Sequence, residues 1–272
     1  MTNPSVILDS CVLYPMPLRD TLLRAAEAEL YQVYFSQEIL DGATRNLVRK
    51  GRITDDKAAR FQQMLKMHFP EAMVEVPSEL VAVMNNDPGD RHVVAAAIIA
   101  KAEVIVTSNL KHFPAEALIP YKIEAWHPDD FLVHLDELFP EKMIQVIRQQ
   151  SKDLKNPPLT VIELLNKLEK NNRVPKFTNS ILLSEYSDTV FQIAKKALNK
   201  LGRLAPEGVR YLEGERYRLW QKGQIFTITA KNHRGEIMRL ENDEVRGNLS
   251  SEDIKAFQIF EKELEKEFAE KS

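Results

Sequence analysis

The chain has 272 residues, of which 44% are hydrophobic and 28% are charged, and its formal net charge is −3. This length and apolar content allow a sizeable core, and they favour two domains over one. No apolar run approaches the roughly 20 residues that are needed to cross a bilayer, and the first residues lack the basic segment of a secretory signal. We therefore expect a soluble, cytoplasmic protein with no membrane partner.

The charges are unevenly distributed along the chain. Residues 195–240 contain 11 Lys or Arg against 4 Asp or Glu, whereas residues 241–272 contain 5 against 10. A basic block of this kind favours a polyanion-binding surface. It is equally typical of a solvated surface whose charge is neutralised by acidic neighbours.

The first 135 residues alternate strand patterns with helical patterns. Strands are expected at 5–8, 33–35, 73–76, 104–106 and 123–126, and helices at 18–29, from 36, at 54–68, at 91–102 and at 131–138. Ser36 and Thr54 are expected to cap two of these helices, and either Asp129 or Asp130 the last one. Buried apolar strands that alternate with helices predict an α/β fold with a parallel sheet.

The pattern changes beyond Pro140. Helices are expected at 141–153, 160–170 and 180–201, with a linker over 171–178. Short strands then follow between residues 209 and 249, and Ser250 or Ser251 is expected to cap a final helix. This half of the chain therefore predicts a helical extension followed by a small β-rich module that also contains helices.

Oxygen-bearing side chains fall where predicted strands end or helices begin. Asp9 follows the strand at 5–8 and Asn109 follows the strand at 104–106, so both are expected in the crevice at the carboxyl ends of the parallel strands. Asp87 and Asp90 lie in the turn that opens the helix at 91–102. The single cysteine, Cys11, excludes an intramolecular disulfide and a Cys-rich zinc site. Oxygen ligands and a divalent cation are the remaining interpretation.

Each of these positions also has a purely structural explanation. Asp87 and Asp90 can serve only to cap a helix, and acids early in the helix that starts near residue 36 suit the helix dipole. Asn109 can cap the turn after its strand. Thr107 either donates a hydrogen bond to one of the acids or merely ends a strand.

Five segments of the chain carry a family resemblance. They are VILDSCVLYP at 6–15, FSQEILD at 35–41, DPGDRH at 87–92, TSNLKHFP at 107–114 and HPDDFL at 127–132. Together they resemble a PIN-domain ribonuclease, and specifically the VapC-type toxins of bacterial toxin–antitoxin pairs that have a helical extension after the PIN domain. The resemblance covers about residues 1–180. It implies a three-layer fold around a central parallel sheet, dependence on Mg²⁺ or Mn²⁺, and endonucleolytic cleavage of RNA.

The resemblance also implies boundaries, site residues and partners. A PIN-like nuclease domain is expected at 1–138 and a helical extension at 139–178. The resemblance does not extend over residues 179–272, which are expected to form an α+β module of unknown role. The expected catalytic residues are Asp9, Asp41, Asp90 and Asn109. The expected metal ligands are Asp9, Asp90, Asp41, Glu38 and Asp87. The expected partners are RNA, a cognate antitoxin protein and a second copy of the chain, because PIN domains of this type often dimerise.

Three residues depart from the subgroup's usual pattern. Gly42 stands where an acid usually follows Ile-Leu-Asp, Gly89 replaces one Asp of an Asp-Pro-Asp-Asp segment, and His112 stands where an Asp often precedes Phe-Pro. Either Asp41 or Glu38 is then expected to replace the missing acid. These departures leave a second interpretation open, in which the chain is a catalytically weakened PIN-like scaffold that binds RNA or a protein partner.

RNA contact requires positive charge outside the acidic crevice. Arg45 and Arg49 are spaced to share one helix face, and Lys111 lies near Asn109, so all three cations are expected to bind phosphates. An ordinary solvated surface explains the same residues.

The strand expected at 216–221 interleaves basic and aromatic residues. Arg216, Tyr217, Arg218, Trp220 and Lys222 suit a surface that binds a single-stranded nucleic acid. Alternation on a small sheet, with Tyr217 facing inwards, produces the same pattern.

Overall fold

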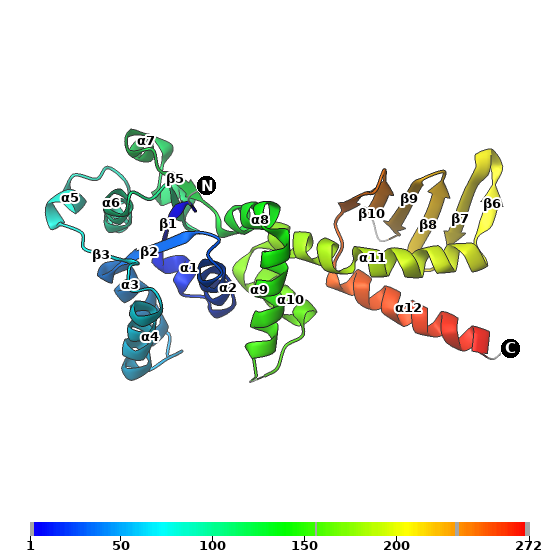
Figure 1. The fold of residues 1–272 in the computed structure, drawn as a ribbon, viewed down its shortest axis with the longest axis horizontal. Coiled ribbons are helices and arrows are strands. Elements are labelled where there is room, and N and C mark those ends of the chain that lie inside the picture. The colour runs from blue at the N-terminus through cyan, green and yellow to red at the C-terminus, as the bar shows by residue number, and fades with distance from the viewer. Residues whose placement is uncertain (1–2, 156, 232–233, 270–272) are drawn as a thin grey trace. The chain divides into compact units, whose positions relative to one another are not determined.

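The computed structural model describes residues 3–155, 157–231 and 234–269, with side chains described as far as residue 266. The chain divides into two compact units, Met1–Phe177 and Thr178–Ser272 (Figure 1). Among the described residues, none of the helices combines the length and hydropathy that a membrane-spanning segment requires.

The first unit is built around a five-stranded parallel sheet with the strand order β3-β2-β1-β4-β5. Its strands are β1 (Ser5–Leu8), β2 (Gln32–Ser36), β3 (Met73–Val74), β4 (Val104–Val106) and β5 (Glu124–Trp126). Val6, Ile7 and Leu8 of the central strand are fully buried. Burial on both faces explains why the central strands are continuous apolar runs. The predicted parallel α/β fold is therefore confirmed.

Helices surround this sheet, and two of them begin at their predicted caps. They are α1 (Ser10–Leu13), α2 (Met16–Glu27), α3 (Gln37–Arg49), α4 (Asp55–His68), α5 (Ser78–Ala82), α6 (Arg91–Ala100), α7 (Ala115–Leu118), α8 (Pro128–Leu138), α9 (Pro140–Asp153) and α10 (Val161–Asn172). Two 3₁₀ helices, η1 (Leu110–His112) and η2 (Ile119–Tyr121), flank α7. The Oγ of Ser36 accepts the N–H of Ile39, and the Oγ1 of Thr54 accepts the N–H of Lys57. Both predicted caps are confirmed.

The expectation that Asp129 or Asp130 caps α8 is wrong. The cap is His127, whose Nδ1 accepts the N–H of Asp129 at 3.2 Å. The buried carboxylate of Asp129 instead accepts the N–H groups of Lys176, at 3.2 Å, and Phe177, at 2.9 Å. Asp129 therefore satisfies two of the free donors at the start of another helix, 47 residues along the chain.

The linker expected over 171–178 is also wrong. Helix α10 continues to Asn172, and α11 (Pro175–Leu201) begins only three residues later. Pro175 is the first residue of α11, a position where its missing N–H is not needed. The Asp129 carboxylate then binds the next two N–H groups, which is why the helix starts earlier than its local pattern predicts.

The second unit contains a six-stranded antiparallel sheet with the order β11-β10-β9-β8-β7-β6. Its strands are β6 (Arg203–Ala205), β7 (Val209–Glu213), β8 (Tyr217–Lys222), β9 (Ile225–Ala230), β10 (Gly235–Glu241) and β11 (Glu244–Gly247), and it ends with α12 (Ser251–Ala269). The Oγ of Ser250 accepts the N–H of Asp253, so Ser250 is the cap of α12. The predicted β-rich module with helices is confirmed, and β6 is an additional strand.

Candidate metal centre

The carboxylate of Asp9 is held at the carboxyl end of β1. It is only 1% exposed, and its Oδ2 accepts a hydrogen bond of 2.7 Å from the Oγ1 of Thr107, the residue that follows β4. The Sγ of Cys11 donates to the same oxygen at 3.0 Å, and the Oγ of Ser10 donates to Oδ1 at 3.2 Å. Because β1 and β4 are parallel neighbours, their ends place Asp9 and Thr107 side by side. Thr107 therefore hydrogen-bonds an acid and does not merely end a strand.

Cys11 is a hydrogen-bond donor in this network. Burial, followed by the charge of Asp9, raises the pKa of its thiol to about 12. The thiol therefore stays protonated at neutral pH and can donate to the Asp9 carboxylate. A protonated, largely buried thiol is a poor nucleophile, which assigns Cys11 a structural part in the site.

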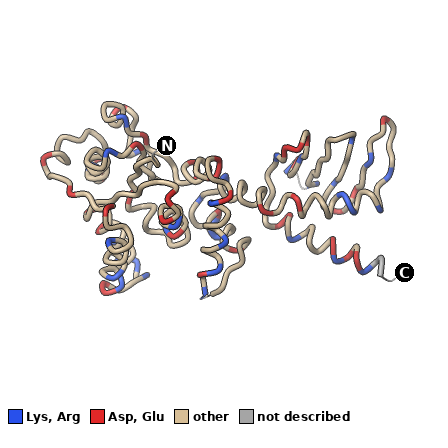
Figure 2. The backbone as a smooth tube through the Cα atoms, viewed as in Figure 1, with Lys and Arg blue, Asp and Glu red and all other residues tan. Residues whose placement is uncertain are grey.

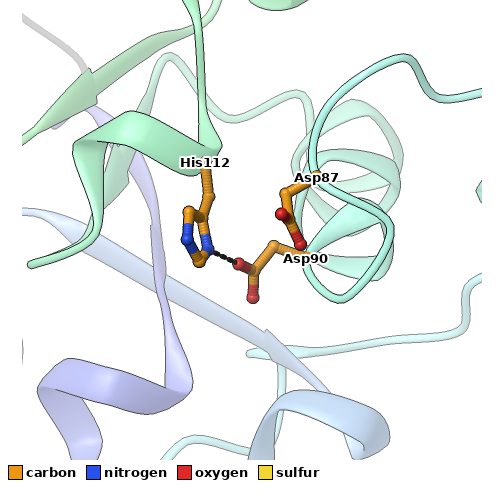
Figure 3. A group of neighbouring side chains, drawn as sticks. All are labelled: Asp87, Asp90 and His112. Atoms are coloured by element: carbon orange, nitrogen blue, oxygen red, sulfur yellow. Dashed lines mark hydrogen bonds and ion pairs between the residues drawn. The ribbon is translucent and has the colours of Figure 1, made fainter.

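A second group of side chains, here called the acidic cluster, consists of Asp87, Asp90 and His112 (Figure 3). One ligand atom from each of the three residues lies within 4.8 Å of the other two. The Nδ1 of His112 lies 2.6 Å from the Oδ2 of Asp90, while the Oδ1 of Asp87 accepts the N–H of Gly89 at 2.9 Å. Asp90 occupies the N-cap position of α6, as predicted, although its side chain makes no capping hydrogen bond.

The loop that follows β4 contacts both Asp9 and the acidic cluster. Its first residue, Thr107, donates to Asp9, and His112 at its far end pairs with Asp90. Asn109 lies between them, where its N–H donates to the Oγ1 of Thr107 and its carbonyl oxygen accepts the N–H of His112. The side-chain amide of Asn109 makes no hydrogen bond to another described residue. One short loop therefore holds the carboxylates of Asp9 and Asp90 by hydrogen bonds and leaves the side-chain amide of Asn109 free of hydrogen bonds to the other described residues.

Asp41 faces α4. Its Oδ1 accepts hydrogen bonds from the Nε2 of Gln37, at 2.8 Å, and from the Nε2 of Gln62 on α4, at 3.0 Å. No hydrogen bond joins Asp41 to Asp9 or to the acidic cluster among the described residues. A catalytic or metal-binding role of Asp41 stays a prediction.

Position 42 lies against Ser10, which donates a hydrogen bond to Asp9. A Cβ added to Gly42 would lie 3.2 Å from the Cβ of Ser10 and 3.4 Å from its Oγ. Glu38, one helical turn before Gly42, is 63% exposed, with its Oε1 3.9 Å from the Nδ1 of His92 on α6. Ser10 thus lies against position 42, where the family that the chain resembles usually has an acid. Glu38 lies one turn away on the same face of α3.

Comparison with known proteins assigns the first part of the chain. Residues 5–111 match the family model described as PIN domain, and residues 128–183 match the model described as VapC50 C-terminal domain. Residues 5–111 are a PIN domain. The resemblance to PIN-domain proteins of the VapC type, with a C-terminal extension, is therefore confirmed.

A curated relative supports the same assignment. Over 100 residues the chain is 49% identical to a protein of Mycobacterium tuberculosis (strain ATCC 25618 / H37Rv) named "Putative ribonuclease VapC50". The match covers 37% of this chain and 58% of the relative, so the chain spans little more than half of that protein's length. No solved structure matches the chain.

Several cations lie on the surface of the PIN domain. Arg45 and Arg49 are exposed on α3, and Lys111 is exposed in η1 next to the acidic cluster. The amino group of Lys50 lies 4.9 Å from the ring centre of Tyr14, just after α1. Tyr14 was not singled out in the sequence, because a cation over an aromatic ring leaves no local pattern.

Proposed function

We propose that this chain is a divalent-metal-dependent endoribonuclease, the toxin of a toxin–antitoxin pair. The supporting observation is that one loop of a PIN domain joins the buried carboxylate of Asp9 to the acidic cluster, through Thr107 and His112. The nuclease domain is proposed to span residues 1–138, the helical extension 139–178, and the α+β module 179–272.

The donor set fits a hard divalent cation. The carboxylates of Asp87 and Asp90 approach one another and His112 closely enough to share an ion, and close carboxylates repel one another unless a cation is present. Mg²⁺ retains several water molecules and needs only one or two carboxylates, so the exposed position of Asp87 suits it. The hydrogen bond from His112 would orient Asp90, as outer-shell partners do at metal sites.

The proposed division of labour follows from these contacts. A bound Mg²⁺ or Mn²⁺ would supply an activated water molecule and offset charge on the scissile phosphate. Asp9, held in place by Thr107, would orient that water, and the free amide of Asn109 would contact a phosphate oxygen. Arg45, Arg49 and Lys111 would hold neighbouring phosphates, which makes RNA affinity fall with salt.

The proposed partners follow from the VapC type of the chain. We propose RNA as substrate, a cognate antitoxin protein as inhibitor, and a homodimer as the assembled form. The proposed location is the cytoplasm, where such a substrate would be met.

A second candidate function is favoured by Gly42. No acid stands at the position that faces Ser10, and the nearby Asp41 is hydrogen-bonded by two glutamines. The alternative is therefore a weakened PIN scaffold that binds RNA or a protein partner without cutting RNA.

RNA cleavage under defined metal conditions separates the two candidates. We expect the full chain to cleave RNA with Mg²⁺ or Mn²⁺ but not with EDTA, and Asp9→Asn to lose this activity. Asp20→Asn, which removes a partner of Arg24 on α2, is the matched control and should retain the activity. No cleavage under any metal, with the chain shown to be folded by circular dichroism, would favour the scaffold.

Thermal unfolding tests the metal site without activity. Mn²⁺ should raise the melting temperature of the wild type but not that of Asp90→Asn. Equal shifts in both proteins would show that the acidic cluster does not hold the ion.

A further inference from the structure

The sheet of the second unit has one face covered by helices. Phe226 on β9 packs edge-on against Phe191 of α11, with ring centres 5.7 Å apart. Tyr217 on β8 packs against Phe257 of α12, with ring centres 4.9 Å apart, and its hydroxyl donates to the Oδ1 of Asp253. Figure 1 shows α11 and α12 along the same side of this sheet. Because side chains alternate along a strand, the residues next to Tyr217 and Phe226 point to the opposite face.

A single row of side chains crosses that opposite face. Residues paired directly across an antiparallel sheet share a face and lie about 5 Å apart. Continuous pairing across all six strands defines the outer row: Arg203, Tyr211, Trp220, Thr227, Arg239 and Arg246. The row therefore places two adjacent aromatic rings in its centre and arginines at both ends.

The aromatic part of the outer row is accessible. Tyr211 is 38% exposed and Trp220 is half-buried. Thr227, the next residue in the row, is 1% exposed, and its hydroxyl has no hydrogen-bond partner in the described part of the chain. The centre of the row thus offers two partly exposed aromatic rings, and the hydroxyl of Thr227 beside them is buried.

Arginines lie on both sides of this face. Arg203 is exposed and forms no ion pair with another described residue, and the exposed Arg218 pairs with Glu213 at 3.2 Å. On the other side, Arg239 pairs with Glu241 at 2.8 Å, so both signs of charge are mixed there, as Figure 2 also shows for the second unit. Exposed ion pairs contribute little to stability, so such cations can exchange a carboxylate for a phosphate.

We propose that the outer row binds single-stranded RNA. Bases would stack on Trp220 and Tyr211, while Arg203 and Arg239 contact phosphates. Proteins that bind single strands combine aromatic platforms with basic side chains, and small antiparallel sheets stack two or three bases in this way. The choice of RNA over DNA rests on the proposed ribonuclease function, whereas the stacking surface does not.

Tryptophan fluorescence provides a direct test, because the chain has two tryptophans. Trp126→Phe leaves Trp220 as the remaining fluorophore. We titrate this variant, as the full chain in EDTA, with a single-stranded RNA of about 12 nucleotides, within the site sizes known for such surfaces. Stacking should quench the fluorescence, and the affinity should fall with rising salt.

Substitutions in the row provide the second measurement, by anisotropy of labelled RNA in EDTA. Trp220→Leu and Tyr211→Leu should each raise Kd at least about fivefold, the lower limit expected for losing one stacked base. The matched control is Tyr121→Leu, a tyrosine of the first unit that is 41% exposed, and its Kd should stay within about twofold of the wild type.

Defined outcomes would overturn the proposal. One is that the fluorescence of Trp220 stays unchanged at about 100 µM RNA, since even non-specific complexes form below this concentration. The face would then belong to another occupant, such as a protein. Equal quenching by duplex RNA would refute stacking, and equal affinity for DNA of the same sequence would refute the assignment to RNA. A chain that binds RNA through the row in EDTA, but does not cut RNA when Mg²⁺ or Mn²⁺ is supplied, would support this inference and contradict the proposed function.

Discussion

Replacing Thr107 by valine should loosen the Asp9 carboxylate without leaving a cavity. The side chain of Thr107 is fully buried, and its hydroxyl donates to Asp9 at 2.7 Å and accepts the N–H of Asn109 at 3.0 Å. Valine has nearly the same shape as threonine but neither donates nor accepts. Thr107→Val thus removes one hydrogen bond to a carboxylate and leaves one N–H without its partner.

The expected loss of stability follows from these two bonds. A hydrogen bond to a charged group contributes about 1.5–3 kcal/mol, and a neutral one about 1 kcal/mol. We therefore expect Thr107→Val to lower the free energy of unfolding by about 2–4 kcal/mol. RNA cleavage should fall about 10–100-fold, the usual effect of removing a residue that orients a metal-site carboxylate.

The assays are urea unfolding and RNA cleavage with Mn²⁺ at a temperature where each variant is folded. Thr107→Ser keeps the hydroxyl and should retain most of both properties. Thr21→Val is the matched control. The hydroxyl of Thr21 is also fully buried, 2.8 Å from the Oε1 of Gln150 on α9, so this substitution should lower stability while leaving cleavage unchanged.

Two results would contradict this role of the Thr107 hydroxyl. Full cleavage activity in folded Thr107→Val would show that the hydroxyl does not position Asp9 for the reaction. An equal loss of cleavage in Thr21→Val would show that the loss reports general destabilisation, and not a change at Asp9.

Three further predictions test other contacts. Asp129→Ala should lower the free energy of unfolding by about 2–4 kcal/mol, because two N–H groups of α11 lose their acceptor. Asp130→Ala removes only an exposed ion pair, so the free energy of unfolding should change little in the same urea experiment. Iodoacetamide should modify Cys11 far more slowly in the folded chain than in urea at pH 8. Folding raises the pKa of the Cys11 thiol from 9.0 to about 12. The contribution of this thiol to stability is therefore complete below pH 9 and is lost as the pH rises to 12. Gly247→Ala should lower the stability of the second unit by at least about 2 kcal/mol, because φ at Gly247 is +147° and the new Cβ would lie 2.2 Å from a carbonyl oxygen of β10. The control is Gly208→Ala, whose new Cβ meets no atom within 4 Å and which should lower stability less. Both variants are measured by circular dichroism melting.

The correct predictions from the sequence depended on residues close together in the chain. Ser36 and Thr54 were identified as caps because a cap and the N–H that it accepts are three residues apart. The apolar run before Asp9 predicted a buried strand, and strand direction alone brought the ends of β1 and β4 together. The carboxylate of Asp9 and the amide of Asn109, which follow these strands, were therefore expected to share one crevice before any contact was known.

The errors arose where a distant residue competed for a side chain. Asp129 matched a local cap, but its carboxylate binds α11 instead and His127 takes the cap position. Either Asp41 or Glu38 was expected to replace the acid missing at position 42, and that role stays a prediction. A helix turns by about 100° per residue, so Asp41 and position 42 point in different directions. Only the packing of α3 between α1 and α4 showed that Gly42 faces Ser10 and that Asp41 faces Gln62.

By itself, the sequence determined the parallel α/β domain, the β-rich module and the segments that supply the site, because strands, caps and turns depend on neighbours within about four residues. The tertiary structure decided which groups meet. Thr107 reaches Asp9 across 98 residues and His112 reaches Asp90 across 22, and the pairing of six strands put Trp220 on the open face while Tyr217 turned towards α12. Such contacts depend on how the chain closes upon itself, which no local pattern records.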